Sequence, residues 1–165
     1  MNTKKVAFLG LSIALAMVLS FLESQIPPLM AVPGMKLGLP NLVMVFLLYK
    51  VGWKETCIVS LIRIFLVSLI FANVQVLVFS VAGAILSLAG MILMKNLRVF
   101  SCISVSVAGG ILHNVGQIAI ACLWTQTAGV ALYLPPLLIS GTVAGAIIGL
   151  VAGILVKKLE RLNLM

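Results

Sequence analysis

Six apolar segments, separated by short polar or cationic stretches, make up most of this chain. We predict helices through a membrane over residues 6–26, 37–49, 56–72, 74–94, 99–124 and 136–156. A hydrocarbon core of about 30 Å needs about 20 helical residues, so the segment over 37–49 is short unless the preceding loop also enters the membrane zone. We therefore predict an all-α integral membrane protein, a compact bundle of six transmembrane helices that forms a single domain over residues 1–165.

The composition supports the same class. Hydrophobic residues make up 63% of the chain and charged residues 8%, against roughly 25% charged residues in average globular proteins. The net charge of +8 would suggest nucleic acid in a soluble protein, but here the cationic residues fall in clusters between apolar segments, where topology explains them. We predict contact with membrane lipid and none with nucleic acid. The first segment lacks a cleavage pattern and is interpreted as a retained helix.

The cationic residues also predict an orientation. If the chain crosses six times, nine of the eleven Lys and Arg residues fall on one side: Lys4, Lys5, Lys50, Lys54, Lys95, Arg98, Lys157, Lys158 and Arg161. The opposite loops, around residues 27–36, 72–74 and 125–135, hold only Lys36. Cytoplasmic loops carry the excess of cations, so both termini are predicted to be cytoplasmic.

Two helices carry faces of small residues. The last helix has glycines four residues apart, which favours close packing of another backbone: Gly141, Gly145, Gly149 and Gly153. The first helix repeats the pattern with Ser12, Ala16 and Ser20, and again with Gly10 and Ala14. One such face could serve a partner protein rather than an internal neighbour, and the sequence leaves this open.

The run from Pro33 to Asn41 contains two prolines and two glycines, which force tight turns, and Lys36 lies in its middle. Asn41 could cap the helix that follows. We expect this run to form one wall of a polar pocket near the outer membrane surface. The alternative is an ordinary loop with a helix cap.

Arg63 lies near the middle of its predicted helix, where a charge is costly and should face the bundle interior or a wet cavity. Glu23 is the one acidic residue within an apolar segment, so Arg63 either pairs with Glu23 or contacts a ligand. His113, Asn114 and Gln117 form a polar stripe in the fifth segment. These three side chains either contact a ligand or hold helices together.

The residues needed for catalysis are missing. The chain has no aspartate and three glutamates, so it offers no paired carboxylates for a Mg²⁺-diphosphate reaction. It also lacks a Gly-rich phosphate loop. Cys57, Cys102 and Cys122 are far apart without metal-ligand spacing. We predict a protein that is not an enzyme and that has no metal site and no cofactor.

Several motifs together resemble those of the bacterial Gx transporter family, whose members are often labelled heptaprenyl diphosphate synthase component I. The likeness covers most of the chain and rests on these residues: Pro33, Lys36-Leu37-Gly38-Leu39, Asn41, Arg63, Gly109-Gly110, His113-Asn114 and Gln117. The family is similar to the substrate-binding S components of energy-coupling factor transporters. Those components usually carry an Ala-x-x-x-Ala signature on the first helix, where this chain has Ser12, Ala16 and Ser20.

This resemblance implies a six-helix protein of the bacterial cytoplasmic membrane, with a ligand pocket toward the outer surface. It implies partners as well: a coupling membrane subunit and two ATPases. We expect a small, anionic, partly apolar ligand, bound by Lys36, Asn41, Arg63, His113, Asn114 and Gln117. The alternative is a non-catalytic accessory membrane subunit in isoprenoid-quinone (heptaprenyl diphosphate) metabolism or in extracellular electron transfer.

Overall fold

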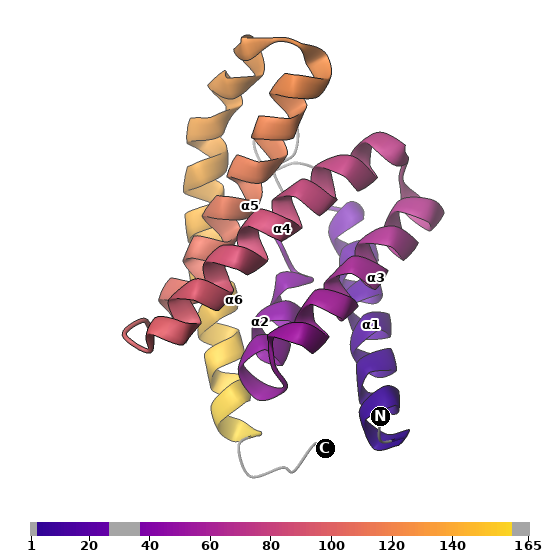
Figure 1. Ribbon diagram of the computed structural model, residues 1–165, viewed down its shortest axis with the longest axis vertical. Helices are drawn as coiled ribbons and strands as arrows, with labels where there is room; N and C mark the ends of the chain where they lie inside the picture. Colours follow the sequence, from indigo (N-terminus) through magenta and orange to yellow (C-terminus); the bar gives the residue numbers. More distant parts are fainter. Residues whose placement is uncertain (1–2, 27–36, 160–165) are drawn as a thin grey trace.

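The structure is a computed structural model that describes residues 3–26 and 37–159. Its described residues form six α-helices and one short 3-10 helix (Figure 1): α1 (Thr3–Ser24), α2 (Asn41–Lys50), α3 (Trp53–Phe71), α4 (Val74–Leu97), α5 (Cys102–Thr125), η1 (Ala128–Tyr133) and α6 (Leu134–Lys158). The prediction of an all-helical protein with six α-helices is confirmed for this part of the chain.

The start of α2 corrects the predicted boundary at residue 37. Gly38 has a φ of 72°, a left-handed conformation that a continuing helix does not adopt, so α2 begins only at Asn41. Pro40 occupies the N-cap position, and the N–H groups of Asn41 and Leu42 bond to the carbonyls of the preceding turn. The hypothesis that the Asn41 side chain caps this helix is therefore wrong.

Four other helices also start at residues that differ from the prediction, and α1 already includes Thr3, before the predicted start at residue 6. Helix α5 begins at Cys102 rather than at residue 99, because the Ser101 hydroxyl accepts a hydrogen bond from the Ser104 N–H and caps it. Helix α3 begins at Trp53, directly after Gly52, rather than at residue 56. Helix α6 begins at Leu134 rather than at residue 136, because the first turn of a helix tolerates proline.

Helix α2 is the centre of the bundle. Every residue of this short helix is buried or half-buried, which is typical of a helix enclosed by other helices. Its Val45 and Leu48 belong to an apolar cluster with residues of α4, α5 and α6, whereas Val43, Met44 and Leu47 belong to a second cluster with α1 and α3. In Figure 1, α2 lies between these two groups of helices, so it joins the two halves of the core.

The glycine face of α6 lies against α5, where two backbones approach closely. A Cβ added at Gly149 would lie 2.7 Å from the Ile103 Cα, nearer than real Cβ atoms come. Gly153, one turn later, is less crowded, since its added Cβ would lie 3.8 Å from the Cys102 Cβ. Helices α4 and α5 also touch through glycine, because a Cβ at Gly116 would meet the backbone of α4 at 2.8 Å. The three C-terminal helices thus form a tightly packed layer.

The two small-residue faces of α1 have different surroundings. Ser12 and Ala16 are buried, and Ala16 belongs to the cluster that α1 shares with α2 and α3. Gly10 and Ala14 are exposed, and nothing lies within 4 Å of a Cβ added at Gly10. The face with Ser12 and Ala16 therefore packs within the chain, and the face with Gly10 and Ala14 points outward.

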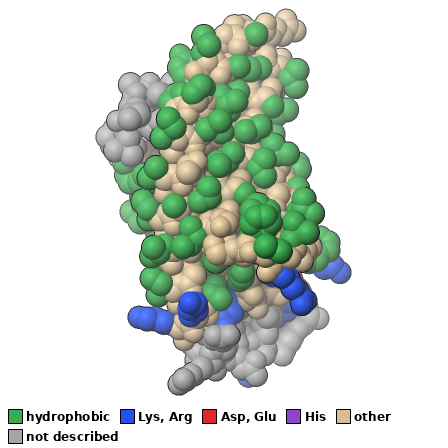
Figure 2. All heavy atoms as spheres, turned by 90° about the vertical axis from the view of Figure 1, so that its left-hand side faces the viewer, with side chains coloured by type: hydrophobic (Ala, Val, Ile, Leu, Met, Phe, Trp, Pro, Cys, Tyr) green, Lys and Arg blue, Asp and Glu red, His purple; other side chains and the backbone are tan. Residues whose placement is uncertain are grey.

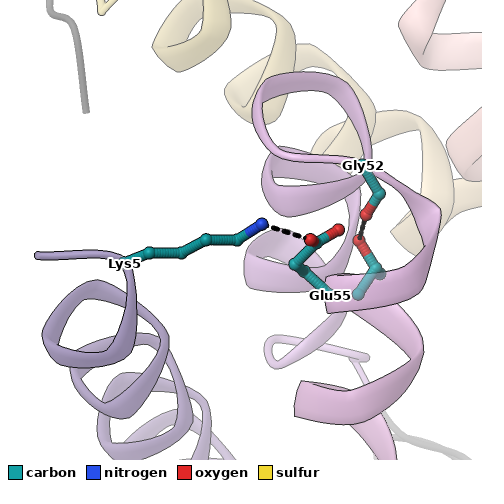
Figure 3. A network of polar contacts seen from close by, with 4 residues as sticks. Lys5, Gly52 and Glu55 are labelled. Carbon is teal, nitrogen blue, oxygen red and sulfur yellow. Dashed lines mark hydrogen bonds and ion pairs between the residues drawn. The ribbon is translucent and has the colours of Figure 1, made fainter. Parts of the chain in front are cut away.

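The lysine-bearing helix ends meet at one end of the bundle, which we call the cationic end. Lys5 of α1 forms an ion pair with Glu55 of α3, beside the Gly52 turn (Figure 3). Lys50 of α2 donates to the carbonyl of Leu159 after α6, and Lys95 of α4 donates to a carbonyl of α2. Figure 2 shows Lys and Arg side chains gathered at this end, below a surface with apolar side chains spread over it.

Within residues 3–26 and 37–159, four helical segments are long and apolar enough to cross a membrane: Thr3–Ser24, Val74–Leu97, Cys102–Thr125 and Ala128–Lys158. Helix α2 has ten residues and spans only about 15 Å, half of a hydrocarbon core. Helix α3 has 19 residues but includes Lys54, Glu55 and Arg63. The chain is therefore a membrane protein in which four of the six predicted crossings are supported by helix length and composition.

Candidate ligand-binding site

A cavity of about 240 Å³ lies inside the bundle, and all six α-helices contribute to its wall. Its lining residues come from the second half of α1, the start of α2, the middle and end of α3, the first part of α4 and the middle of α6. These parts of the helices are distant from the cationic end. The turn at Leu37–Pro40 also lines the cavity, as does the middle of α5.

Five of the six residues predicted to contact a ligand line this one cavity: Asn41 of α2, Arg63 of α3, and His113, Asn114 and Gln117 of α5. The sixth, Lys36, lies outside the described residues. These residues are up to 76 positions apart in the sequence. They come together because α5 packs against α4 and α6, while α2 contacts α6 and α3 contacts α4.

Arg63 contributes a guanidinium group to the cavity wall from the middle of α3. Its Nη1 donates a hydrogen bond to the Ser20 hydroxyl of α1 at 3.1 Å. Its Nε is buried and has no hydrogen-bond partner. A buried, charged N–H group without an acceptor is costly, so this atom is a strong candidate for contact with a ligand or with water.

Glu23 lies on the same wall, three residues after Ser20 on α1. Its carboxylate accepts a hydrogen bond from the backbone N–H of Gly38, which fastens the turn before α2 to α1. The carboxylate also attracts the Arg63 guanidinium electrostatically. Glu23 and Arg63 therefore interact, while Arg63 still presents its Nε to the interior. The two roles considered for Arg63, pairing and ligand contact, are compatible in this geometry.

The polar stripe of α5 is placed by a glycine on the neighbouring helix. A Cβ added at Gly83 of α4 would lie 2.9 Å from the His113 Cε1 and 3.0 Å from the Gln117 Cγ. Any larger residue at position 83 would push these side chains away from α4. Gly83 therefore lets the His113 and Gln117 side chains lie directly against α4 at the cavity edge.

Asn114 has a structural role in the same stripe. Its Nδ2 donates a hydrogen bond to the backbone carbonyl of Leu137 at 2.6 Å and so ties α5 to α6. The contact occurs beside Gly141, whose missing side chain leaves room for the amide. Asn114 therefore lines the cavity and also holds two helices together. From the sequence, ligand contact and helix packing were treated as alternative roles for this stripe.

Several cavity residues were not predicted from the sequence. They are Glu23 and five serines: Ser20, Ser24, Ser68, Ser80 and Ser106. Ser20, Glu23 and Ser24 share one face of α1 through their three- and four-residue spacing, a signal that was available in the sequence. Single serines in the other helices give no such signal, because serine is common in membrane helices.

The described lining carries charges of both signs. Arg63 is the cation and Glu23 the anion, and hydroxyl, amide and imidazole groups surround them. Side chains such as Val67 and Phe71 supply apolar surface. Among the described residues, no three His, Cys, Asp or Glu side chains gather into a group that could hold a metal ion. The wall therefore offers hydrogen-bonding groups, charges of both signs and apolar surface.

Residues 12–155 match the sequence profile of a family described as heptaprenyl diphosphate synthase component I. The chain belongs to this family. The match spans all six α-helices and every residue of the described cavity wall. No curated protein and no solved structure gives a match.

The family's description names one component of a synthase. In this member of the family, the two described glutamates lie at opposite ends of the bundle, Glu23 at the cavity and Glu55 at the cationic end. The described part of the chain thus brings no two carboxylates together. Holding a Mg²⁺-diphosphate group usually takes one or two carboxylates with the phosphates, and the cavity offers one.

Proposed function

We propose that this protein is a membrane-embedded binding component that captures a small, anionic, partly apolar molecule from the outer side of a bacterial cytoplasmic membrane. One observation carries the proposal: a cavity inside the bundle is lined by the guanidinium of Arg63 together with the imidazole and amide groups of α5. His113 and Gln117 face Arg63 across the same space. An ionisable residue at this depth of a membrane bundle is expensive and usually functional.

The anionic group of the ligand follows from the hydrogen-bonding capacity of the wall. Arginine presents several N–H donors in a planar fork that matches carboxylate and phosphate oxygens. The amide of Gln117 and the ring of His113 add neutral donors. Glu23 partly balances the charge of Arg63, so we expect one anionic group rather than a polyanion.

The size of the cavity sets a limit on the rest of the ligand. Its volume of about 240 Å³ lies just below the ~300–1,000 Å³ of sites for drug-sized ligands. Ile64, Val67, Phe71 and Ile148 would contact a compact apolar body. A complete heptaprenyl chain is far larger than this space, so we do not propose heptaprenyl diphosphate as the molecule enclosed here.

The direction of capture follows from the charge distribution. Lysines and arginines accumulate on the cytoplasmic side of membrane proteins, so we propose that the cationic end faces the cytoplasm with both termini. The cavity would then face the outer side. In this arrangement α3 forms the third crossing, and α2 with the turn at Leu37–Pro40 forms part of the second.

A binding component of this kind needs an energy source elsewhere, because the chain has no nucleotide-binding loop. We propose a separate coupling membrane subunit with two ATPases. The face of α1 with Gly10 and Ala14 is the candidate contact, because it is exposed and admits a close-packed helix. We further propose that the chain is not itself an enzyme.

An accessory role is the second candidate, because the family's description names a synthase component. In that role the protein would hold enzymes of isoprenoid-quinone metabolism at the membrane. Affinity purification from native membranes separates the two. Recovery with an ATPase pair supports capture and transport, whereas recovery with a prenyltransferase supports the accessory role.

The decisive experiment for the proposed function is mass spectrometry of small molecules that stay bound to the purified protein in nanodiscs. We expect one compound to be retained by the wild type and lost from Arg63→Gln. Arg98→Asn is the matched control, because Arg98 is an exposed arginine at the cationic end and asparagine tolerates its left-handed backbone. Equal retention of the compound by Arg63→Gln and the wild type would place the binding site elsewhere.

A further inference from the structure

A second, much smaller cavity adjoins the main one at Arg63, and we call it the side chamber. It shares Asn41, Arg63 and His113 with the main cavity, and its volume is about 10 Å³. A single water molecule needs about 10–15 Å³ of such space. The side chamber therefore has room for one oxygen atom and its hydrogens, and for nothing larger.

Two buried hydroxyl groups face the side chamber from opposite helices. Ser60 of α3 is 2% exposed and Ser87 of α4 is 3% exposed. Ser12, another buried serine, donates to a carbonyl of its own helix. The side-chain hydroxyls of Ser60 and Ser87, by contrast, make no hydrogen bond to any residue that the structure describes. Their hydroxyls are uncommitted within a chamber that also contains Arg63.

The Arg63 Nε supplies the third polar group. It is buried without a hydrogen-bond partner, and Arg63 lies one helical turn after Ser60, on the same face of α3. A buried water typically makes about three hydrogen bonds to groups that would otherwise be unsatisfied. The chamber supplies three: the Nε–H donates, and two hydroxyls donate or accept.

We infer that the side chamber is a binding site for one ordered water molecule, held by Arg63 Nε, Ser60 and Ser87. The water accepts the hydrogen bond of the Arg63 Nε–H on the side of the chamber. The Nη atoms remain for Ser20, which Nη1 contacts, and for the main cavity. Ser60 and Ser87 do not line the main cavity. They are positioning residues that act on it through this water and Arg63, and this last step rests on the proposed function.

The test uses water itself as the probe. The protein is labelled with ¹⁵N-arginine, refolded from denaturant in ligand-free buffer and placed in nanodiscs. The Nε–H signal of Arg63 is identified by its loss in Arg63→Lys. We expect a through-space cross-peak between this proton and a long-lived water, with the sign that distinguishes it from chemical exchange. Absence of this cross-peak in the wild type would overturn the inference.

Two variants sharpen the result. The double variant Ser60→Ala and Ser87→Ala removes two of the three partners, so the cross-peak should be lost while the Arg63 signal remains. Ser12→Ala, another buried serine, should leave it unchanged. Persistence of the cross-peak in the double variant would also overturn the inference. Retention of a small molecule plays no part here, so the water site and the proposed function fail independently.

Discussion

Two glycines on one face of α6 allow a quantitative test of the layer formed by α5 and α6. An alanine at Gly149 would place its Cβ 2.7 Å from the Ile103 Cα and 2.8 Å from the Ser106 Cβ, so the two helices must separate. An alanine at Gly153 would meet Cys102 at 3.8 Å, an ordinary contact. The two substitutions are chemically identical and lie one helical turn apart.

The expected difference in the free energy of unfolding can be worked out because the helix-propensity gain is common to both variants and cancels. Replacing glycine with alanine in a helix gains about 0.8–1.0 kcal/mol of helix propensity, and this gain is nearly the same at both positions. The difference between the variants is therefore the overpacking at Gly149 alone, about 1–3 kcal/mol. We expect Gly149→Ala to be less stable than Gly153→Ala by this amount.

The assay is equilibrium unfolding in mixed micelles with increasing sodium dodecyl sulfate, followed by tryptophan fluorescence. Both variants are compared with the wild type at equal protein and detergent concentrations, because the apparent free energy of unfolding depends on them. If Gly149→Ala unfolds at the same denaturant fraction as Gly153→Ala, the close approach of α5 and α6 at Ile103 is not as the structure describes it.

Three further predictions concern other parts of the bundle. The hydrogen bond from Lys5 holds the pKa of the Glu55 carboxyl below its ordinary value of 4.5; the ion pair therefore stabilises the fold above that pH by about 0.2–1 kcal/mol. The stability difference between the wild type and Glu55→Gln should disappear as the pH falls through the lowered pKa, and a difference constant from pH 7 to pH 3 would contradict this. Asn114→Ala removes the hydrogen bond from α5 to the Leu137 carbonyl, which keeps the Ser140 hydroxyl as a donor; we expect a loss of about 0.5–1.5 kcal/mol in the same unfolding assay, and unchanged stability would show that the bond contributes nothing. In a cysteine-free background, Val130→Cys in η1 should react with a membrane-impermeant maleimide from outside intact cells, and labelling only after lysis would reverse the proposed orientation.

The number and type of the helices could be predicted because apolar segments of this length have few alternatives in a membrane. Their ends could not be placed as well. Asn41 resembles a helix cap in the sequence, yet Gly38 and Pro40 shape the preceding turn so that Asn41 falls inside the helix. In the same way, the Ser101 side chain caps α5, so that this helix begins at Cys102 and not at residue 99.

The candidate site was predictable where a residue is unusual for a membrane helix. Arg63, His113 and Gln117 stand out from their apolar neighbours, and the cavity brings them together. Glu23 was considered only as a pairing partner of Arg63, although its spacing from Ser20 and Ser24 places all three on one face of α1. Ser60 and Ser87 could not be found at all, since only the packing of α3 against α4 gives them a common chamber.

Tertiary packing also decides which of the two small-residue faces of α1 is exposed and so available to a partner. Ser12, Ala16 and Ser20 matched the expected spacing, but Ser12 and Ala16 are buried in the chain's own core. Gly10 and Ala14 have equivalent spacing and remain exposed. Spacing identifies a face on which helices can approach closely, whereas only the tertiary structure shows whether that face is already occupied.

The glycines shared between α5 and α6 divide the cavity into a fixed wall and an adjustable one. Gly110, Gly141 and Gly145 line the cavity while their helices touch backbone to backbone, so a side chain added there would separate α5 from α6 before it reduced the cavity. The opposite wall, on α1 and α3, consists of side chains such as Val67 and Phe71 that can change in size. Variation in ligand size among related proteins should therefore be found on α1 and α3, with α5 and α6 serving as a constant template.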